Sequence, residues 1–449
     1  MTPITREIAQ RVAGTRLEDI PDAVTSYSKT LAMSALGAMV AGPECVGSDI
    51  VTRYVQRAGG ASEASVCGSG GRTSVEGAAL ANATYAHATE YEDDSFPEAV
   101  SSYTLFPAIF ALGEHRRCDG RAVLEAFVLA YETQARIGLA CREARRLGYM
   151  VLALAGAIGC AVAGAKLLRL DARRTVNAIS IAASQGSGIG LQTGSMAHIV
   201  EMGFAARNGL TAALLAADGF TGQPDVLEAP RGLFNIITAG KVENIDGIVT
   251  DWGRPYRVLE VGIKQYPCCY HLQRIIETTV GLRDSGRLIA DEVQEVQVEV
   301  NAFFPTVVQH PEPRDAIEAQ FSLPHAVAAA LLEPRVLPSS FSMEKVNDER
   351  FRQFRRKARM VVREDWGWTP TGWTPRIVFR LRNGSEIVER PERSKGQPPQ
   401  LLSFDECVPK YRGCVEGLVP ELGIARSIEM LRSLEDCADV GELMRTVAH

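Results

Sequence analysis

The chain has 449 residues, of which 46% are hydrophobic and 23% charged, and its formal net charge is −6. This length is enough for two or more domains, and the composition is that of an ordinary globular protein. No segment concentrates Lys and Arg with aromatic residues between them, which argues against a nucleic-acid-binding protein.

Cysteine spacing and the N-terminus bear on the cellular location. Ten cysteines are scattered without a CxxC pair or zinc-finger spacing, so we expect a reducing, cytoplasmic environment. The N-terminal MTPITREIAQRV lacks the apolar stretch of a signal peptide. The most apolar run, 150–168, is rich in Ala and Gly and resembles segments at 207–219 and 326–332. It therefore predicts a buried helix, and no membrane partner is expected.

Residues 1–265 form a succession of predicted helices, because apolar residues recur at every third or fourth position. Gly or Pro often follows the end of these segments, as is typical of helix C-termini. The predicted helices are 23–42, 74–94, 106–116, 120–141, 172–185 and 203–219. Their Ala and Gly content predicts closely packed helices.

The pattern changes after Pro267, where strands are predicted. In segment 294–304, Val296, Val298 and Val300 alternate with polar residues and would share one face. Segment 374–391 alternates in the same way and contains Asn383-Gly384, a pair that suits a hairpin turn. A further strand is predicted at 358–365, and helices at 323–333 and 348–359.

These elements predict a mainly α protein of two domains. Residues 401–449 return to the helical pattern after a polar, Pro-containing stretch. We therefore expect a large all-helical domain formed by both chain ends, residues 1–265 and 401–449. A smaller α+β domain, residues 266–400, would be inserted into it.

The segment HATEYEDDSF concentrates carboxylates at the end of a predicted helix. If that helix runs to residue 94, its periodicity places His87, Glu90 and Asp94 on one face, and Glu92 and Asp93 elsewhere. Two effects are unfavourable here, the repulsion between neighbouring like charges and the helix dipole at a C-terminus, and each costs roughly a few tenths of a kcal/mol. These costs favour a functional use for the acids. A frayed, hydrated helix end would also tolerate these acids, so a plain surface remains an alternative.

Two other motifs are incomplete. The acidic DDSFPE loosely resembles the magnesium motif of terpene cyclases, but no second motif completes a metal site, so we expect no metal. SQGSGIGLQTGSMAH is rich in glycine, yet it follows a predicted helix and no GKS or GKT follows, which argues against nucleotide binding. A loop of small residues that approaches a substrate, with Gln192 in it and His198 at its end, fits better.

The segment VGIKQYPCCYHLQ lies at the predicted domain border, a favoured place for a ligand site. Lys264 could offer an ammonium group to a carboxylate or enolate oxygen. Tyr266, Cys269 and His271 could line the site, or the last two could act as an acid/base pair. An ordinary buried Cys and exposed Lys explain the segment equally well. His325, at the start of an apolar helix, is more often structural than catalytic.

Taken in this order, these stretches resemble the MmgE/PrpD family, whose known members include 2-methylcitrate dehydratase, cis-aconitate decarboxylase and an iminodisuccinate epimerase. SVEGAALANATYAHATEYEDD is similar to the family pattern AA-x-x-NG-x-x-x-H-x-x-D-x-DD, matched at Asn82, His87 and Asp93, with Glu90 at the first aspartate position. KQYPCC is similar to the Lys-x-Tyr-Pro-x-Cys motif, and QFSLPHAVAAALL to a Phe-Ser-x-x-Tyr segment with His325 in place of Tyr. The resemblance covers almost the whole chain.

The resemblance implies an inserted lid, an active site in the cleft between lid and helical domain, and a homodimer. It also implies chemistry without a metal or organic cofactor. A base removes a proton next to a carboxylate, or CO₂ leaves, and cationic groups stabilise the enolate-like species. Lys264 matches a site lysine of the family, and His198 falls near the place of another basic residue. The acid/base would be His198 or His325.

Three histidines of family members that act on tricarboxylates are absent, and Val100, Met150 and Cys269 stand near their places. An apolar wall at Val100 and Met150 predicts a larger, less charged substrate of a specialised pathway. We therefore expect a cofactor-independent lyase for a carboxylate- or carbonyl-containing small molecule, acting by elimination or decarboxylation. An isomerase, epimerase or cyclase on the same fold, or an inactive binding or scaffold protein, are the alternatives. The expected substrate contacts are His87, Glu90, Asp93, Asp94, Val100, Met150, Gln192, Tyr266, Cys269 and His271, with Lys264, His198 and His325 catalytic.

Overall fold

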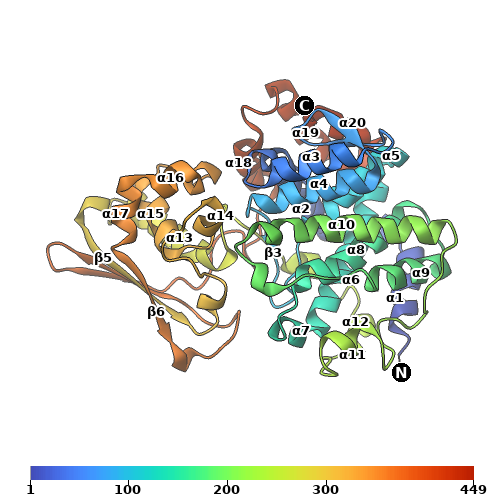
Figure 1. Ribbon diagram of the computed structural model, residues 1–449, viewed down its shortest axis with the longest axis horizontal. Coiled ribbons are helices and arrows are strands. Elements are labelled where there is room, and N and C mark those ends of the chain that lie inside the picture. The colour runs from blue at the N-terminus through green and yellow to red at the C-terminus, as the bar shows by residue number, and fades with distance from the viewer. Residues whose placement is uncertain (1, 449) are drawn as a thin grey trace.

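A computed structural model describes residues 2–448 and shows a mainly helical protein with two bodies of unequal size (Figure 1). The larger body contains both ends of the chain, and its hydrophobic core draws on residues 4–263 and 402–447. The smaller body has a separate core, formed by residues 268–387. Each body buries its own hydrophobic core, so the surfaces where the two bodies meet are a place where a pocket can form.

The centre of the larger body is a layer of long apolar helices. They are α2 (Asp22–Ala41), α4 (Val75–Ala88), α5 (Leu105–Arg116), α6 (Gly120–Ala140), α8 (Val151–Leu167) and α10 (Met196–Ala217). Every residue of α8 except Leu152 is buried, which confirms the buried-helix interpretation of the most apolar run. Small residues allow close approach: a Cβ on Gly209 of α10 would lie 2.4 Å from the carbonyl oxygen of Ala157 in α8.

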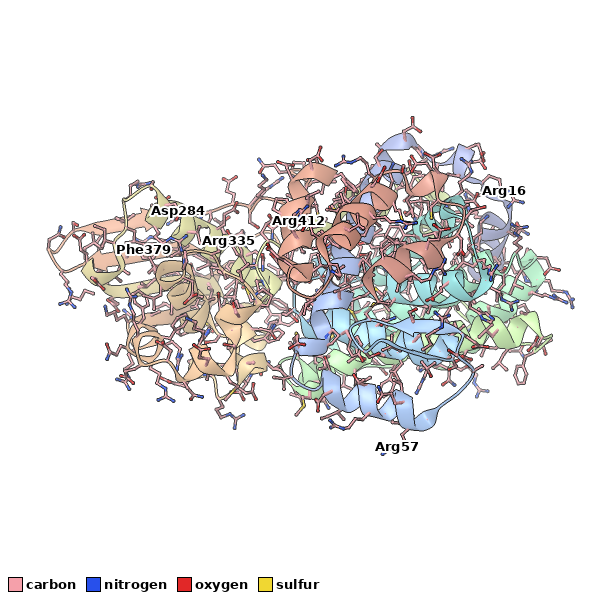
Figure 2. The ribbon with its side chains drawn as sticks, turned by 90° about the horizontal axis from the view of Figure 1, so that it is seen from above. Arg16, Arg57, Asp284, Arg335, Phe379 and Arg412 are labelled. Atoms are coloured by element: carbon pink, nitrogen blue, oxygen red, sulfur yellow. The ribbon has the colours of Figure 1, made fainter. Side chains whose placement is uncertain are left out.

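The remaining helices of the larger body are shorter. They are α1 (Ile4–Gly14), α3 (Ser48–Ala58), α7 (Arg142–Arg146), α9 (Ala172–Ala183), α11 (Leu233–Ile237), α12 (Gly247–Thr250), α18 (Phe404–Val415), α19 (Glu421–Arg432) and α20 (Val440–Val447). Tyr411 of α18 packs against Gly37 of α2, where a Cβ would lie 3.1 Å from its ring. The last fifty residues thus complete the core that the first two hundred begin. Figure 2 shows Arg412 of α18 on the larger body, whereas Asp284, Arg335 and Phe379 lie in the smaller one.

The smaller body is built on a four-stranded sheet with the order β6-β5-β7-β8. These strands are β5 (Val293–Asn301), β6 (Ala358–Arg363), β7 (Arg376–Leu381) and β8 (Glu386–Glu389). Strand β6 is parallel to β5, while β5–β7 and β7–β8 are antiparallel pairs. Val296, Val298 and Val300 are fully buried, and Gly384 turns the β7–β8 hairpin with a φ of 86°, so both predictions are confirmed.

Helices complete the core of the smaller body on the sheet. They are α13 (Gln273–Asp284), α14 (Ala316–Gln320), α15 (Leu323–Leu332), α16 (Met343–Asn347) and α17 (Glu349–Arg355). Helix α15 is the central one, since all its residues but the last are buried. The predicted helix 348–359 was too long, because the chain leaves α17 after Arg355 to enter strand β6 at Ala358.

The acidic segment is where the structure departs most from the predicted elements. Helix α4 ends at Ala88 and does not continue to residue 94, and Glu90 follows with a left-handed φ of 50°. The chain then forms strand β3 (Asp93–Asp94), which pairs antiparallel with β4 (Gly262–Ile263). This pairing, with a segment that is distant in sequence, outweighs the local helical pattern and determines where each carboxylate points.

Cysteines and apolar helices are ordinary in this fold. The ten cysteines all fall within the described chain and are free thiols. Among helices of residues 2–448, no single one has both the length and the apolar composition to cross a membrane. Only a pair bent by 91°, Asp22–Glu44 with Ser48–Ala58, passes on those two criteria together.

Candidate active site

A pocket of about 370 Å³ lies at the junction of the two bodies. The larger body contributes His87, Glu90, Glu92, Asp94, Phe96, Arg145, Tyr149, Met150, Leu191 and His198, among others, to its wall. The smaller body contributes Cys269, Tyr270, His271, Phe303, Val307, Phe321 and Trp368. Titratable groups therefore come mostly from one side and aromatic groups mostly from the other.

Lys264 lies below the pocket wall, next to strand β4, and does not line the pocket. Its Nζ donates to Oε1 of Glu90 and to Oε1 of Glu92, each at 2.7 Å, and its side chain is 1% exposed. Burial alone would lower the pKa of Lys264, but the adjacent carboxylates outweigh it and hold that pKa well above its usual value. The structure thus corrects the expectation that the ammonium faces the substrate: it faces two carboxylates.

The two aspartates of β3 have different surroundings. Asp93 is fully buried, and its Oδ1 accepts hydrogen bonds from the Ser101 hydroxyl at 2.5 Å and from the Ser102 N–H at 2.8 Å. Asp94 lines the pocket, and burial raises the pKa of its carboxyl well above the ordinary value, an effect that Glu92 and Glu90 reinforce. Asp93 therefore holds the strand in place, whereas Asp94 is a candidate proton donor.

The predicted partition of the acidic segment was wrong. A helix to residue 94 would turn Glu92 and Asp93 away from Glu90, yet Glu92 is 5% exposed and shares Lys264 with Glu90. The reason is the left-handed turn at Glu90 together with the pairing of β3 with β4, which bring Glu90 and Glu92 to the same lysine. The alternative of a hydrated surface is also wrong, because Glu90, Glu92 and Asp93 are all buried.

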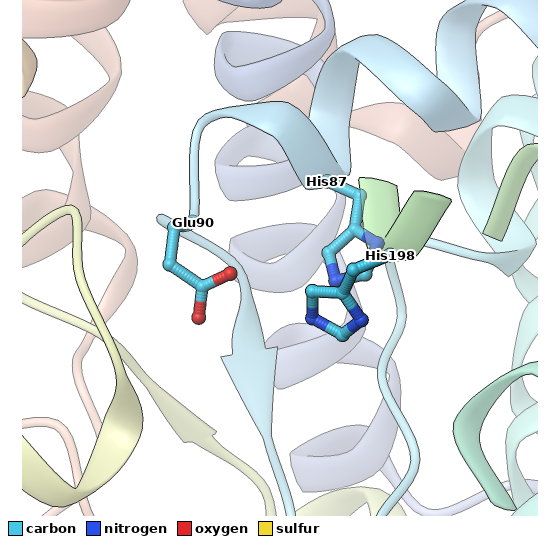
Figure 3. A group of neighbouring side chains, drawn as sticks. All are labelled: His87, Glu90 and His198. Atoms are coloured by element: carbon cyan, nitrogen blue, oxygen red, sulfur yellow. The ribbon is translucent and has the colours of Figure 1, made fainter. Parts of the chain in front are cut away.

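His87 and His198 face each other at one end of the pocket, with Glu90 beside them (Figure 3). The centres of the two imidazole rings are 4.4 Å apart in an edge-to-face arrangement. Burial, together with the neighbouring His198, lowers the pKa of His87 to about 3, so His87 is neutral at physiological pH. Nδ1 of His198 is 3.5 Å from Oε2 of Glu201, one turn further along α10. Neither atom has a hydrogen-bond partner among residues 2–448, so Glu201 is a candidate to orient His198 once that ring carries a proton.

Among residues 2–448, His87, Glu90 and His198 form a group with the residue types of a metal site, and their ligand atoms lie within 4.8 Å of one another. Ligands of a tetrahedral metal with bonds of about 2.1 Å lie about 3.4 Å apart. One carboxylate oxygen, Oε1 of Glu90, already accepts a hydrogen bond from Lys264. As arranged, the group suits hydrogen bonding to a polar ligand better than it suits metal coordination.

Arg145 is a pocket residue that sequence reasoning missed. It lies on the short helix α7, and its guanidinium sits over the ring of Phe96 at 5.3 Å and donates to the carbonyl of Pro97 at 2.6 Å. Burial lowers the pKa of Arg145 to about 10, which leaves it charged at neutral pH. The sequence gives no signal for it, because Arg142 and Arg146 flank it with the same side chain.

Aromatic side chains around His271 are the second group of pocket residues that the sequence did not predict, although His271 itself was predicted. The rings of Phe96 and His271 are 5.3 Å apart, those of His271 and Phe303 5.3 Å, and those of Phe303 and Trp368 5.1 Å. Tyr270 lies 5.1 Å from Phe96. We call these five residues the aromatic wall. It carries little charge, since burial lowers the pKa of His271 to about 3.

The structure brings seven of the predicted site residues together around the pocket. They are His87, Glu90, Asp94, Met150, His198, Cys269 and His271. Helix α10 begins at Met196, so His198 stands in its first turn and not in a loop. Met150 lines the pocket, as the expected apolar wall requires, whereas Val100, the other residue expected in that wall, does not.

Four other predicted residues lie outside the pocket wall. Val100 is fully buried behind the bridge that it forms with Ser95. Tyr266 lines a different cavity, on the side of α18, and Gln192 accepts a hydrogen bond from Ser195 within its own loop. His325 is described next.

His325 lies in the core of the smaller body and is fully buried. Its Nε2 is 2.9 Å from the carbonyl oxygen of Ser340, and its Nδ1 is 3.3 Å from Nη1 of Arg355. Burial lowers the pKa of His325 to about 4. These contacts support a structural role for His325. The expectation that His325 contacts the substrate is therefore corrected.

Comparisons with known proteins identify a family over most of the chain. Residues 6–245 match the model of the MmgE/PrpD N-terminal domain, and residues 266–436 match that of the MmgE/PrpD C-terminal domain. A cis-aconitate decarboxylase-like protein of Aspergillus oryzae is 26% identical over 99% of this chain and 97% of its own length. Cis-aconitate decarboxylase of Aspergillus terreus is 26% identical over 98% and 95%, and that of Homo sapiens 22% identical over 98% and 93%.

Proposed function

The chain belongs to the MmgE/PrpD family, and from this membership we propose that it is a cofactor-independent lyase for a small molecule with a carboxylate or carbonyl group. A base removes the proton next to that group, and the enolate-like species then loses a leaving group, or the substrate loses CO₂. The names of the relatives, several of which are decarboxylases, support a lyase of the dehydratase/decarboxylase type.

One observation carries the mechanism: a buried histidine, with a glutamate carboxylate 3.5 Å from its ring, faces a pocket that also holds an aspartate whose pKa burial raises. His198 is the general base, and Glu201, 3.5 Å from its Nδ1, orients the ring. Asp94, whose pKa burial raises well above the ordinary value, is the group placed to donate a proton to the leaving group or to the enolate oxygen. Neutral His87, at 4.4 Å between ring centres, restricts the orientation of His198.

Lys264 acts in this proposal through Glu90 instead of through the substrate. Its Nζ lies 2.7 Å from a carboxylate oxygen of Glu90 and 2.7 Å from one of Glu92, so it pairs with both of these buried groups. Glu90 on the pocket wall can accept a hydrogen bond from a substrate hydroxyl, or from His198 after that ring has taken up the substrate proton. Because Lys264 does not contact the substrate in this proposal, another group has to supply the positive charge that stabilises the enolate oxygen.

The charge balance of the pocket supports a substrate other than a tricarboxylate. Among the described lining residues, Arg145 has the one side chain with a permanent positive charge, whereas Glu90, Glu92 and Asp94 are acids. Lys264 already pairs with Glu90 and Glu92, so Arg145 alone would remain to balance three substrate carboxylates, at a cost on the order of several kcal/mol for the uncompensated charges. A substrate with one or two acidic groups fits this balance.

Solvent deuterium exchange with mass spectrometry tests the proposal. The enzyme is incubated in D₂O with a panel of mono- and dicarboxylic acids that carry a 2- or 3-hydroxyl group or a double bond, and with cis-aconitate and 2-methylcitrate. A lyase gives a product that has lost water or CO₂, and His198→Asn abolishes it. Deuterium uptake without other mass change would instead show an isomerase or epimerase. Ordinary turnover of either tricarboxylate would contradict the substrate class.

A homodimer and a cytoplasmic location are further parts of the proposal. The dimer is supported by the family resemblance, and the location by the free cysteines. Light scattering of the purified chain tests the first, and fractionation of cells the second. A monomer at micromolar concentration would contradict the dimer.

A further inference from the structure

We propose that Arg145 anchors one carboxylate of the substrate and that the aromatic wall beside it receives an apolar substituent of the same molecule. The substrate would then be an acid with an aryl or alkyl group a few bonds from its carboxylate. This inference rests on the proposed function only in that it places the ligand in the same pocket.

Arg145 has a hydrogen-bonding group without a partner. Its Nη2 donates to the carbonyl of Pro97 at 2.6 Å, but its buried Nη1 has no hydrogen-bond partner in residues 2–448, and no carboxylate there lies within 4 Å of the guanidinium. The flanking arginines of α7 are different, since Arg142 pairs with Glu243 at 3.4 Å and Arg146 with Glu143 at 3.6 Å. A buried guanidinium nitrogen without a partner is costly, and a planar carboxylate is the ligand that matches its geometry.

The orientation of Arg145 is set before any ligand binds. One face of its guanidinium lies over the Phe96 ring at 5.3 Å, and the carbonyl of Pro97 holds the opposite nitrogen from Nη1. Because these contacts use the face and one nitrogen, they leave the remaining N–H groups free to bind an anion. A preorganised arginine loses little conformational entropy on binding, which makes it a selective anchor.

Phe96 connects this anchor to the aromatic wall. Its ring lies below Arg145 and is 5.1 Å from Tyr270 and 5.3 Å from His271. The wall continues through Phe303 to Trp368, whose side chain at the pocket rim is 47% exposed. An exposed tryptophan beside an apolar wall favours contact with an apolar ligand group. Phe96 contacts both Arg145 and the other rings of the aromatic wall. A ligand bound to both would therefore carry its carboxylate and its apolar group close together.

The acids at the other end of the pocket exclude the reverse arrangement. Glu90 and Glu92 share Lys264 as an ion-pair partner, and a second substrate carboxylate beside these two groups would be repelled. The anchored carboxylate and the apolar group therefore lie towards Arg145 and Trp368 and away from Glu90 and Glu92, while Asp94 is close enough to Arg145 to oppose the lowering of its pKa.

Calorimetric binding to the full-length protein tests the anchor with three probes: 3-phenylpropanoate, its amide and acetate. We expect 3-phenylpropanoate to bind, and the amide and acetate to bind at least about tenfold more weakly. Arg145→Gln should weaken 3-phenylpropanoate binding about 10- to 100-fold and leave the amide unchanged, with Arg145→Lys in between. Arg146→Gln is the matched control and should leave binding unchanged.

The aromatic wall is tested by Trp368→Ala with the same probes. Loss of the indole should weaken 3-phenylpropanoate about fivefold or more and leave acetate unchanged. Phe220→Ala, which removes an aromatic ring that is 60% exposed away from the pocket, is the control. Circular dichroism and thermal unfolding show that each variant is folded before it is compared.

Several outcomes would overturn the inference. They are no detectable binding of 3-phenylpropanoate at millimolar concentration, equal binding of acid and amide, or an equal loss in Arg145→Gln and Arg146→Gln. Binding is measured without turnover, so a protein that is no lyase can still satisfy the inference. Conversely, lyase activity that survives Arg145→Gln with an unchanged KM contradicts the anchor and leaves the proposed function intact.

Discussion

Nζ of Lys264 lies 2.7 Å from Oε1 of Glu90, a residue 174 positions earlier in the chain. Strand pairing between β3 and β4 makes this contact possible, because it sets the turn that follows α4 beside the segment that leads into the smaller body. The second carboxylate, that of Glu92, completes the group at the same distance. The ion group is therefore both a part of the pocket wall and a link between the two stretches that surround it.

Lys264→Met should lower the free energy of unfolding by about 3–5 kcal/mol, because it leaves buried carboxylates without a cation. Urea unfolding followed by circular dichroism measures the loss. Lys395→Met, which removes an exposed ion pair with Glu406, is the control and should have a small effect. The triple variant Lys264→Met/Glu90→Gln/Glu92→Gln should recover part of the loss. Equal losses in both single variants would contradict this account.

His325 should make the protein less stable in mild acid. Its pKa is about 4 in the folded protein and 6.5 in the unfolded chain. Between these values the unfolded state binds a proton that the folded state does not, so stability falls as the pH drops from 6.5 to 4. In His325→Gln the slope of unfolding free energy against pH should be shallower by about 1.4 kcal/mol per pH unit. An unchanged slope in urea titrations at several pH values would refute the prediction.

Glu201 is expected to act as a positioning residue for His198. In Glu201→Gln the amide oxygen can still accept the hydrogen bond that the Ile189 N–H donates to Oε1 at 2.8 Å, so the fold is retained. We expect kcat to fall about 10- to 100-fold with little change in KM, since the imidazolium loses its charged partner. Steady-state kinetics on the substrate found by deuterium exchange provides the readout. Glu429→Gln, on the exposed face of α19, is the control, and a change confined to KM would contradict the role.

Two glycines in helices should respond in opposite directions to alanine. A Cβ on Gly209 would lie 2.4 Å from both the Ala157 carbonyl oxygen and Cβ of Cys160, so Gly209→Ala has to separate α8 from α10. We expect it to cost about 2 kcal/mol or more. Gly281 in α13 has no atom within 4 Å of an added Cβ, and Gly281→Ala should stabilise the protein by up to about 1 kcal/mol. Thermal unfolding of both variants checks the two signs, and a stabilised Gly209→Ala would be inconsistent with the packing.

Local patterns predicted the elements that owe their structure to their own apolar faces. The periodicity of 120–141 corresponds to α6, and the alternation of 294–304 to β5, because burial of one face decides both. The same reasoning failed at the end of α4, where a strand partner from residues 262–263 replaces the last helical turn. At His325 the local pattern favoured a structural role, which its contacts with Ser340 and Arg355 support, and it was the family resemblance that made this residue a catalytic candidate.

The sequence by itself determined the family, the helical and mixed regions, and the segments from which the pocket is built. Only the tertiary structure decided which members of those segments face the pocket. Lys264 is covered by two carboxylates, whereas Arg145, one of three nearby arginines on α7, has a nitrogen without a partner. The physical reason is that a charge acquires its role from the groups around it. Those groups come from distant parts of the chain, so local spacing cannot specify them.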